Sequence, residues 1–223
     1  MKPIKEQYLV SGFLALFLIH SVQVGVGMLG FQRTVVKVAG YDAWISILIS
    51  GISLHLIVAC MYLLLKRSDG DLMHIHEQLF GKWLGKALSF LVALYFIGLT
   101  ITVLRSYVEI VQVWVFPDLS TWGITLIAMV FFYYVVSGGF RTVVGLAFFG
   151  VIIPIPLFLT LVLPLEYAQF INMLPIMKHS VEELFLGAKE ATLSFIGVEL
   201  LLLFYPFLKN KEDTQKWSQL GVF

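Results

Sequence analysis

The chain has 223 residues, of which 59% are hydrophobic and 13% are charged, and its formal net charge is +1. Globular domains average about 45–50% apolar and about 25% charged residues, so this composition predicts an all-α, polytopic membrane helix bundle, with residues 1–223 in one transmembrane domain. The small net charge and the lack of a basic block argue against nucleic-acid binding.

Six apolar stretches are each long enough to cross a bilayer, which takes about 20 residues in a helix. They lie at approximately 8–32, 41–65, 86–115, 120–138, 143–166 and 188–208. Ten Lys and Arg residues would lie on the side of the N-terminus and four on the other, which predicts a cytoplasmic N-terminus. With six spans, the C-terminus and the basic tail after Phe207 are expected on the cytoplasmic side too.

A glycine-rich interruption lies inside the first apolar stretch, in Gln23-Val24-Gly25-Val26-Gly27-Met28-Leu29-Gly30. Each glycine costs about 1 kcal/mol of helix propensity relative to alanine, so the pattern predicts a broken helix. Backbone that leaves a helix within a bilayer needs partners in a cavity or on a ligand, and transporter-like folds bind substrates at such breaks. Gln23 and His20, just before the break, either line this cavity and bond to its freed carbonyls or form an interhelical hydrogen bond.

The connection between the second and third apolar stretches contains a short one-sided apolar pattern. Asp71 is a capping residue before it and Gly81 ends it, which predicts an amphipathic helix at the inner membrane interface. Its His74 and His76 are two residues apart and point to different faces of a helix, so no metal site is expected there.

The third stretch carries two charged residues, Arg105 and Glu109, at the i, i+4 spacing that brings side chains together on one helical face. They are expected either to form a structural ion pair or to act as a gate or proton-coupling site, because charged side chains inside a membrane are costly. His55 in the second stretch is expected to be a core histidine.

The sixth stretch contains a second candidate break, at Gly197 and Glu199. In the outer connection before it, Ser180 followed by two acids predicts the start of a short surface helix over the outer mouth. Two discontinuous helices can present amide N–H groups and carbonyls to the carboxylate and ammonium groups of an amino acid.

These two glycine motifs resemble those of the amino acid–polyamine–organocation transporter superfamily. Val24-Gly25-Val26-Gly27 is similar to its unwound I/V-G-x-G stretch in span one, and Phe195-Ile196-Gly197-Val198-Glu199 to its F-x-G-x-E motif in span six. Within the superfamily, these segments and the Lys5-Glu6-Gln7 start, together with the sequence from Ala39 to Ile45, resemble the B subunits of spore nutrient germinant receptors.

The resemblance implies a germinant-sensing subunit in the spore inner membrane that works with A-type and C-type receptor subunits and binds a small nutrient such as an amino acid. The implied ligand-binding residues are Gly25, Val26, Gly27, Met28, Phe195 and Gly197, and the implied coupling or gating residues are Gln23, Arg105, Glu109 and Glu199. Members of the superfamily have about ten spans in two inverted five-helix repeats. This chain is expected to hold the first part of that fold, truncated after the sixth span.

Two alternatives remain open: a proton- or sodium-coupled amino-acid transporter, and a non-functional truncated copy. No cofactor is expected. An enzyme is not expected either, because the sequence shows no nucleophile with a base, no phosphate-binding loop and no metal-ligand spacing.

Overall fold

The computed structural model describes residues 4–68 and 70–222, which form helices, turns and one isolated β-bridge without any strand. The side chains of Val26, Leu29 and Ser194 lie outside the described part. The α-helices are α1 (Leu14–Gln23), α2 (Phe31–Ala39), α3 (Ala43–Ser68), α4 (Leu72–Trp114), α5 (Thr121–Ser137), α6 (Phe140–Ile152), α7 (Val181–Ser194), α8 (Leu201–Phe204) and α9 (Lys211–Gly221). The longer 3₁₀ segments are η2 (Val26–Leu29) and η4 (Ile155–Tyr167).

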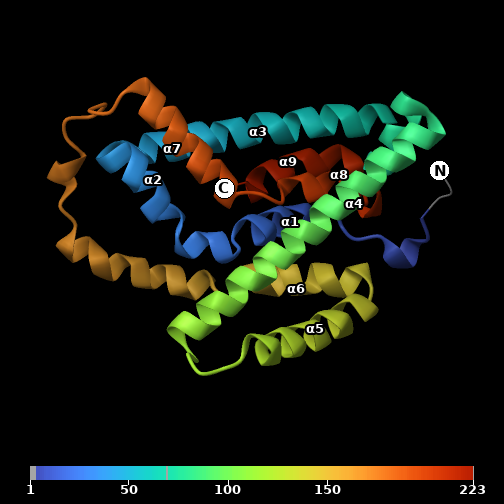
Figure 1. Cartoon of the computed structure of the whole chain (residues 1–223). Helices are drawn as coiled ribbons and strands as arrows, with labels where there is room; N and C mark the ends of the chain where they lie inside the picture. The colour runs from blue at the N-terminus through green and yellow to red at the C-terminus, as the bar shows by residue number, and fades with distance from the viewer. Residues whose placement is uncertain (1–3, 69, 223) are drawn as a thin grey trace.

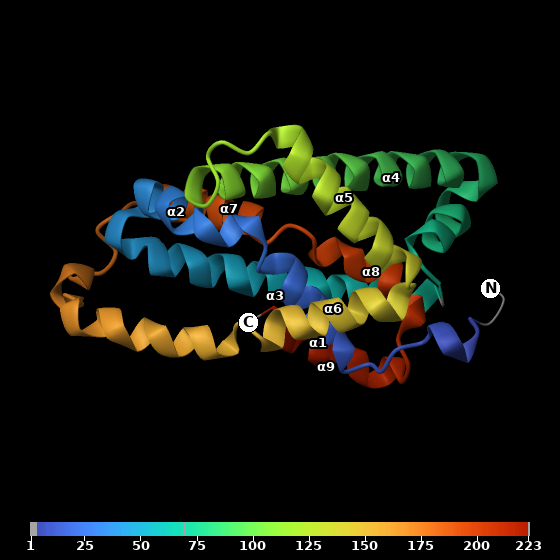
Figure 2. The same cartoon turned by 90° about the horizontal axis from the view of Figure 1, so that it is seen from below.

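The helices form an elongated bundle (Figures 1 and 2), and in the view of Figure 1 α3 runs along one edge while α4 crosses obliquely. At one end of the bundle α7 packs against α2 and α3, and toward the other end α1 packs against α6 and α9. Because α3 contacts helices of both groups, it is the continuous element that joins the two ends.

The core is divided into two main apolar clusters. One cluster joins α2, the first turns of α3 and α7, around Val35, Ala39 and Leu184. The other joins α1, the remainder of α3 and α8, around Ile19, Tyr62 and Leu201. The boundary between the clusters coincides with the interruptions between α1 and α2 and between α7 and α8. The two broken helices therefore each contribute one half to each cluster.

Three helical stretches are long and apolar enough to cross a membrane, namely Phe31–Ser68, Leu72–Trp114 and Phe140–Tyr167. The pair Val181–Leu193 and Val198–Phe207, bent by 53°, can be a fourth span, while α1 and α5 are apolar but shorter. These helices confirm the predicted all-α membrane bundle. The count of six spans and the inverted-repeat arrangement stay predictions.

Several boundaries differ from the sequence-based expectation. Most of the segment 33–40, expected as an outer loop, is part of α2, because the helix resumes directly after the glycine-rich break and ends at Ala39. The expected short surface helix starting at Ser180 is the beginning of α7, which continues into the sixth apolar stretch. The predicted helix start at Ser180 is confirmed, and reciprocal bonds between Ser180 and Glu183 form a capping box there.

The segment after Phe207, expected as a tail, forms α9 and folds back along α1 and α3, and its cytoplasmic location stays a prediction. Polar side chains join α9 to α3: Tyr62 Oη lies 2.8 Å from Ser218 Oγ, and Lys66 Nζ donates to Gln215 Oε1 at 2.9 Å. Gln219 Nε2 donates to the backbone carbonyl of His55 at 3.1 Å. Close packing on α1 explains the small residues of α9, because a Cβ on Gly221 would lie 2.5 Å from the Leu16 carbonyl.

The helix predicted at 71–81 is confirmed as the first segment of α4, and its position at the inner membrane interface stays a prediction. The Asp71 carboxylate accepts the His74 N–H at 2.9 Å, and Gly81 has φ 74° and interrupts the helix. The segment folds back on the rest of α4, so that a Cβ on Gly85 would lie 2.7 Å from the His76 carbonyl.

Candidate functional site

The first break lies where the glycines predict it. Helix α1 ends at Gln23, the Val24 N–H closes the last turn on the His20 carbonyl at 2.9 Å, and Gly25 is extended with φ −103° and ψ −154°. A 3₁₀ turn follows before α2 begins at Phe31. Low helix propensity of glycine accounts for the interruption, since Gly25 does not occupy a conformation that other residues avoid.

The second break depends on backbone geometry that favours glycine. Helix α7 ends at Ser194, and Gly197 has φ +118° before a 3₁₀ turn begins at Val198. Residues with a side chain rarely adopt this φ value. The Glu199 carboxylate stabilises the turn, because its Oε2 accepts the Gly197 N–H at 2.9 Å.

Tyr95 of α4 completes this turn by donating its hydroxyl to Glu199 Oε1 at 2.6 Å. Both oxygens of the Glu199 carboxylate therefore have a donor, one from the break itself and one from the third apolar stretch. Glu199, predicted as a coupling or gating residue, has a structural role in this conformation. Sequence reasoning missed Tyr95, although a tyrosine within a long apolar run was an available signal.

The two breaks lie against each other. A Cβ on Gly197 would overlap Cγ1 of Val22, which is in the last turn of α1. Next to this contact, the rings of Phe31 and Phe195 lie 6.2 Å apart, one at the start of α2 and the other directly after α7. The structure thus brings the predicted Gly197 to the end of α1 and the predicted Phe195 to the start of α2.

The other predicted ligand residues are less enclosed. Gly25 and Gly27 are exposed and Met28 is 41% exposed, while the Val26 side chain lies outside the described residues. Contact between the breaks is therefore made through Val22 and Phe31, which flank the glycines. Neither residue carried a signal in the sequence.

Gln23, predicted as a coupling or gating residue, is the polar side chain buried at the first break. It is 5% exposed, and its Nε2 has no hydrogen-bond partner within the described part of the chain.

The predicted Arg105–Glu109 ion pair is wrong for the described structure. Both side chains are exposed, and no ion pair joins them among the described residues. The buried face of this part of α4 is formed by Leu104 and Val108, which pack on Ile124 of α5. Arg105 and Glu109 each follow a buried residue by one position, which turns them about 100° away from that contact.

An outer staple, formed by Asp42, Met177 and His179, ties the start of α3 to the connection before α7. Asp42 is 2% exposed and accepts the N–H groups of Met177 and His179, both at 3.0 Å, as well as His179 Nδ1 at 3.1 Å. The imidazole packs so closely on Gly40, which has φ +50°, that a Cβ there would overlap the ring. The residues beside the staple line a cavity of about 300 Å³.

An inner clasp, formed by Glu6, Leu9, Val10, Arg141 and Lys209, ties the segment before α1 to the segment after α8. Val10 N–H donates to the Phe207 carbonyl at 2.9 Å, and Lys209 N–H donates to the Val10 carbonyl at 2.8 Å. Lys209 Nζ lies 2.8 Å from Glu6 Oε1, and Arg141 donates to the carbonyls of Glu6 and Leu9. The hydrogen bond from Lys209 and its charge lower the pKa of Glu6.

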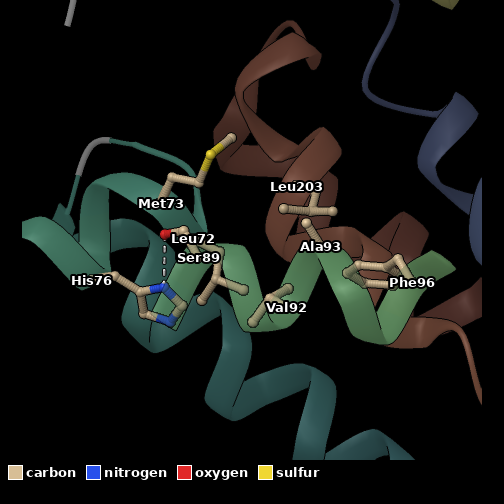
Figure 3. Close-up of a pocket in the computed structure, with 8 residues that line it drawn as sticks. All are labelled: Leu72, Met73, His76, Ser89, Val92, Ala93, Phe96 and Leu203. Carbon is tan, nitrogen blue, oxygen red and sulfur yellow. Dashed lines mark hydrogen bonds between the residues drawn. The ribbon is translucent and has the colours of Figure 1, made fainter. Parts of the chain in front are cut away.

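A smaller cavity of about 120 Å³ lies between the two segments of α4 and α8 (Figure 3). It is lined by Leu72, Met73, His76, Ser89, Val92, Ala93, Phe96 and Leu203. Its polar contact joins His76 Nδ1 and Ser89 Oγ at 3.1 Å. His74 bonds separately to Gln78, and the described residues contain no group of three or more His, Cys, Asp or Glu side chains arranged to hold a metal ion.

Known proteins that match the chain are spore germination proteins. The chain is 44% identical to "Spore germination protein GerQB" of Bacillus cereus over 98% of its own length and 61% of that protein. It is 24% identical to "Spore germination protein B2" of Bacillus subtilis (strain 168) over 98% of its length and 60% of that protein. It is 26% identical to "Spore germination protein YndE" of the same strain, over 93% of its length and 58% of that protein. The chain thus spans about three-fifths of the length of these relatives.

No solved structure matches the chain at a significant level. The profile of the family described as "Spore germination protein" matches residues 9–223, which include both breaks and both halves of the two interrupted helices. The chain belongs to the spore germination protein family.

Proposed function

We propose that this chain is a nutrient-sensing membrane subunit of a spore germination receptor and binds a small nutrient, of the amino-acid class, between its two helix breaks. The observation that carries the proposal is the contact between Val22, at the end of α1, and Gly197, in the second break. Backbone groups that leave a helix inside a membrane bundle are available to a ligand, and here two such segments meet.

Because the core is divided into two clusters, ligand binding can change how the halves of the broken helices are arranged. The halves of both broken helices belong to two apolar clusters that meet at the breaks, and α3 passes through both. A nutrient that binds between the halves with different affinity in two arrangements shifts the population toward one of them. The outer staple ties the start of α3 to the connection before α7, and the inner clasp ties the segment before α1 to the segment after α8.

The inner clasp is also where we propose that occupancy is passed to A-type and C-type partner subunits. Residues predicted to face the cytoplasm gather there, because Lys209 and Arg141 both contact the segment that contains Glu6. This clustering of basic residues is consistent with a cytoplasmic N-terminus in the spore inner membrane. The proposal does not include enzyme chemistry or a cofactor.

Amino-acid transport is the second candidate function, and the Tyr95–Glu199 hydrogen bond is the observation that favours it. A carboxylate at a helix break within a membrane is a proton-coupling candidate. Glu109, on the exposed face of α4, is the other candidate acid for proton coupling. Uptake of radiolabelled amino acids into vesicles separates the functions, since accumulation requires transport and a sensor binds without accumulation.

The site is tested by replacing glycines at the two breaks. Gly25→Leu leaves room for its own Cβ, whose nearest neighbour is the Val22 carbonyl at 3.6 Å, so the side chain is expected to fill the ligand space without unfolding the bundle. Gly150→Leu on α6 is the matched control, because nothing lies within 4 Å of a Cβ there. Loss of the nutrient dose–response in Gly25→Leu alone supports the site, and an unchanged response contradicts it.

A further inference from the structure

Gln23 is the last residue of α1, and the Nε2 atom of its side chain is buried without a partner in the described part of the chain. The side chain is 5% exposed, and its Nε2 forms no hydrogen bond with any described part of the chain. Buried polar groups are nearly always hydrogen-bonded, and an amide that gives up water without a replacement destabilises the fold. A residue that weakens the protein in this way requires another explanation.

The position of Gln23 in α1 suggests a role for its side chain in the nutrient site. Ala15, Ile19 and Gln23 follow one another at four-residue spacing on one face of α1, and the first two are 0% and 1% exposed. Gln23 continues this buried face to the level of the break, next to Val22, which packs on Gly197. Gln23 thus ends α1, one position after the residue that contacts the second break.

Glu199, the acid of the second break, is already occupied. Glu199 accepts hydrogen bonds on both of its oxygens, from Gly197 N–H and from the Tyr95 hydroxyl. With both oxygens accepting hydrogen bonds, Glu199 offers no donor to a carboxylate of a ligand. A ligand carboxylate is therefore better accommodated on the side of α1, where Gln23 offers an N–H donor.

We propose that Gln23 is the specificity-determining residue of the site and that its Nε2 donates a hydrogen bond to the carboxylate of the nutrient. This inference rests on the proposed function and identifies the carboxylate as the group of the nutrient that Gln23 recognises. The amide costs stability in the empty protein and is satisfied when the nutrient binds. Stability and binding should therefore change in opposite directions when Gln23 is replaced.

The test is thermal unfolding of the purified full chain in detergent, for Gln23→Leu and for a matched variant, Gln219→Leu. The Gln219 amide is paired. It donates to the His55 carbonyl at 3.1 Å, and it also forms a hydrogen bond with a ring nitrogen of His55. Without any added nutrient, Gln23→Leu is expected to raise the Tm by a few degrees and Gln219→Leu to lower it. A lower Tm in both variants would show that Gln23 has a structural partner and would overturn the inference.

The ligand chemistry is tested by repeating the measurement with each common L-amino acid and with the amine that lacks its carboxylate. At least one amino acid is expected to raise the Tm of the original chain, its amine is not, and Gln23→Leu is expected to lose the effect. Stabilisation by an amino acid that survives in Gln23→Leu would overturn this inference alone. If no amino acid stabilises the original chain, the proposed nutrient class fails and the inference fails with it.

Discussion

Replacing Gly197 by alanine should destabilise the protein more than a methyl group does at any ordinary surface position. The backbone at Gly197 has φ +118°, and the added Cβ would overlap Val22 Cγ1. Strain of a non-glycine residue at such a φ value costs roughly 1–3 kcal/mol, and overpacking costs roughly another 1–3 kcal/mol. The expected loss is therefore about 2–6 kcal/mol, a large part of the roughly 5–15 kcal/mol that stabilises a typical fold.

Two further variants separate the causes of this loss. In Gly197→Ala combined with Val22→Ala, the overlap is relieved and the backbone strain remains, so only part of the stability should return. Gly25→Ala is the control at the other break, since its φ is −103° and the nearest atom to its Cβ is an ordinary 3.6 Å away. It should change stability by less than about 1 kcal/mol.

The assay is unfolding of the purified protein in mixed micelles, followed by circular dichroism as denaturing detergent is added. A free energy of unfolding for Gly197→Ala that matches that of Gly25→Ala would refute the close contact between the breaks. The same outcome would remove the observation on which the nutrient site is built.

Three other changes test the contacts around the site. Tyr95→Phe removes the 2.6 Å hydrogen bond to Glu199 and should lower the free energy of unfolding by about 1.5–3 kcal/mol, measured in the same micelle assay; no change would contradict a structural role for the bond. Asp42→Ala leaves the N–H groups of the outer staple unpaired and should make the connection before α7 more sensitive to limited proteolysis, whereas an unchanged cleavage rate would count against the staple. Because Lys209 lowers the pKa of Glu6, the contribution of the inner clasp should be fully present above the ordinary value of 4.5 and be lost as the pH falls through the lowered folded-state value. Hydrogen exchange at the clasp amides should show this loss, and Glu6→Gln should abolish the pH dependence; an equal dependence in both proteins would assign it to another group.

Local patterns in the sequence were sufficient to predict several parts of the structure. The glycine-rich stretch predicts the first break because helix propensity depends on the residues themselves. The Asp71 cap and the Ser180 capping box are equally local, since each bond joins residues three positions apart. These features needed no knowledge of the rest of the fold.

Contacts between distant segments could not be predicted in this way. Tyr95 and Glu199 meet only because α4 crosses the second break, and Asp42 meets His179 only because the outer connection returns to the start of α3. The Arg105–Glu109 prediction used a spacing that permits contact but does not require it. Both side chains point away from the α4–α5 contact, which leaves them exposed.

The fold-back of α9 shows a further limit of composition. Its charged residues suited a cytoplasmic tail, but its buried face consists of Thr214, Ser218 and Gly221, which are small enough for close packing on α1. The average polarity of the α9 sequence does not reveal such a narrow buried face.

Nutrient binding at the two breaks is tested most directly by ligand-dependent stabilisation of three proteins: the original chain, Gly25→Leu and Gly150→Leu. At a nutrient concentration of 100 times Kd, binding adds about 2.7 kcal/mol to the free energy of unfolding. The account predicts this gain in the original chain and in Gly150→Leu, and its loss in Gly25→Leu. An equal gain in all three proteins would place the nutrient elsewhere and contradict the account.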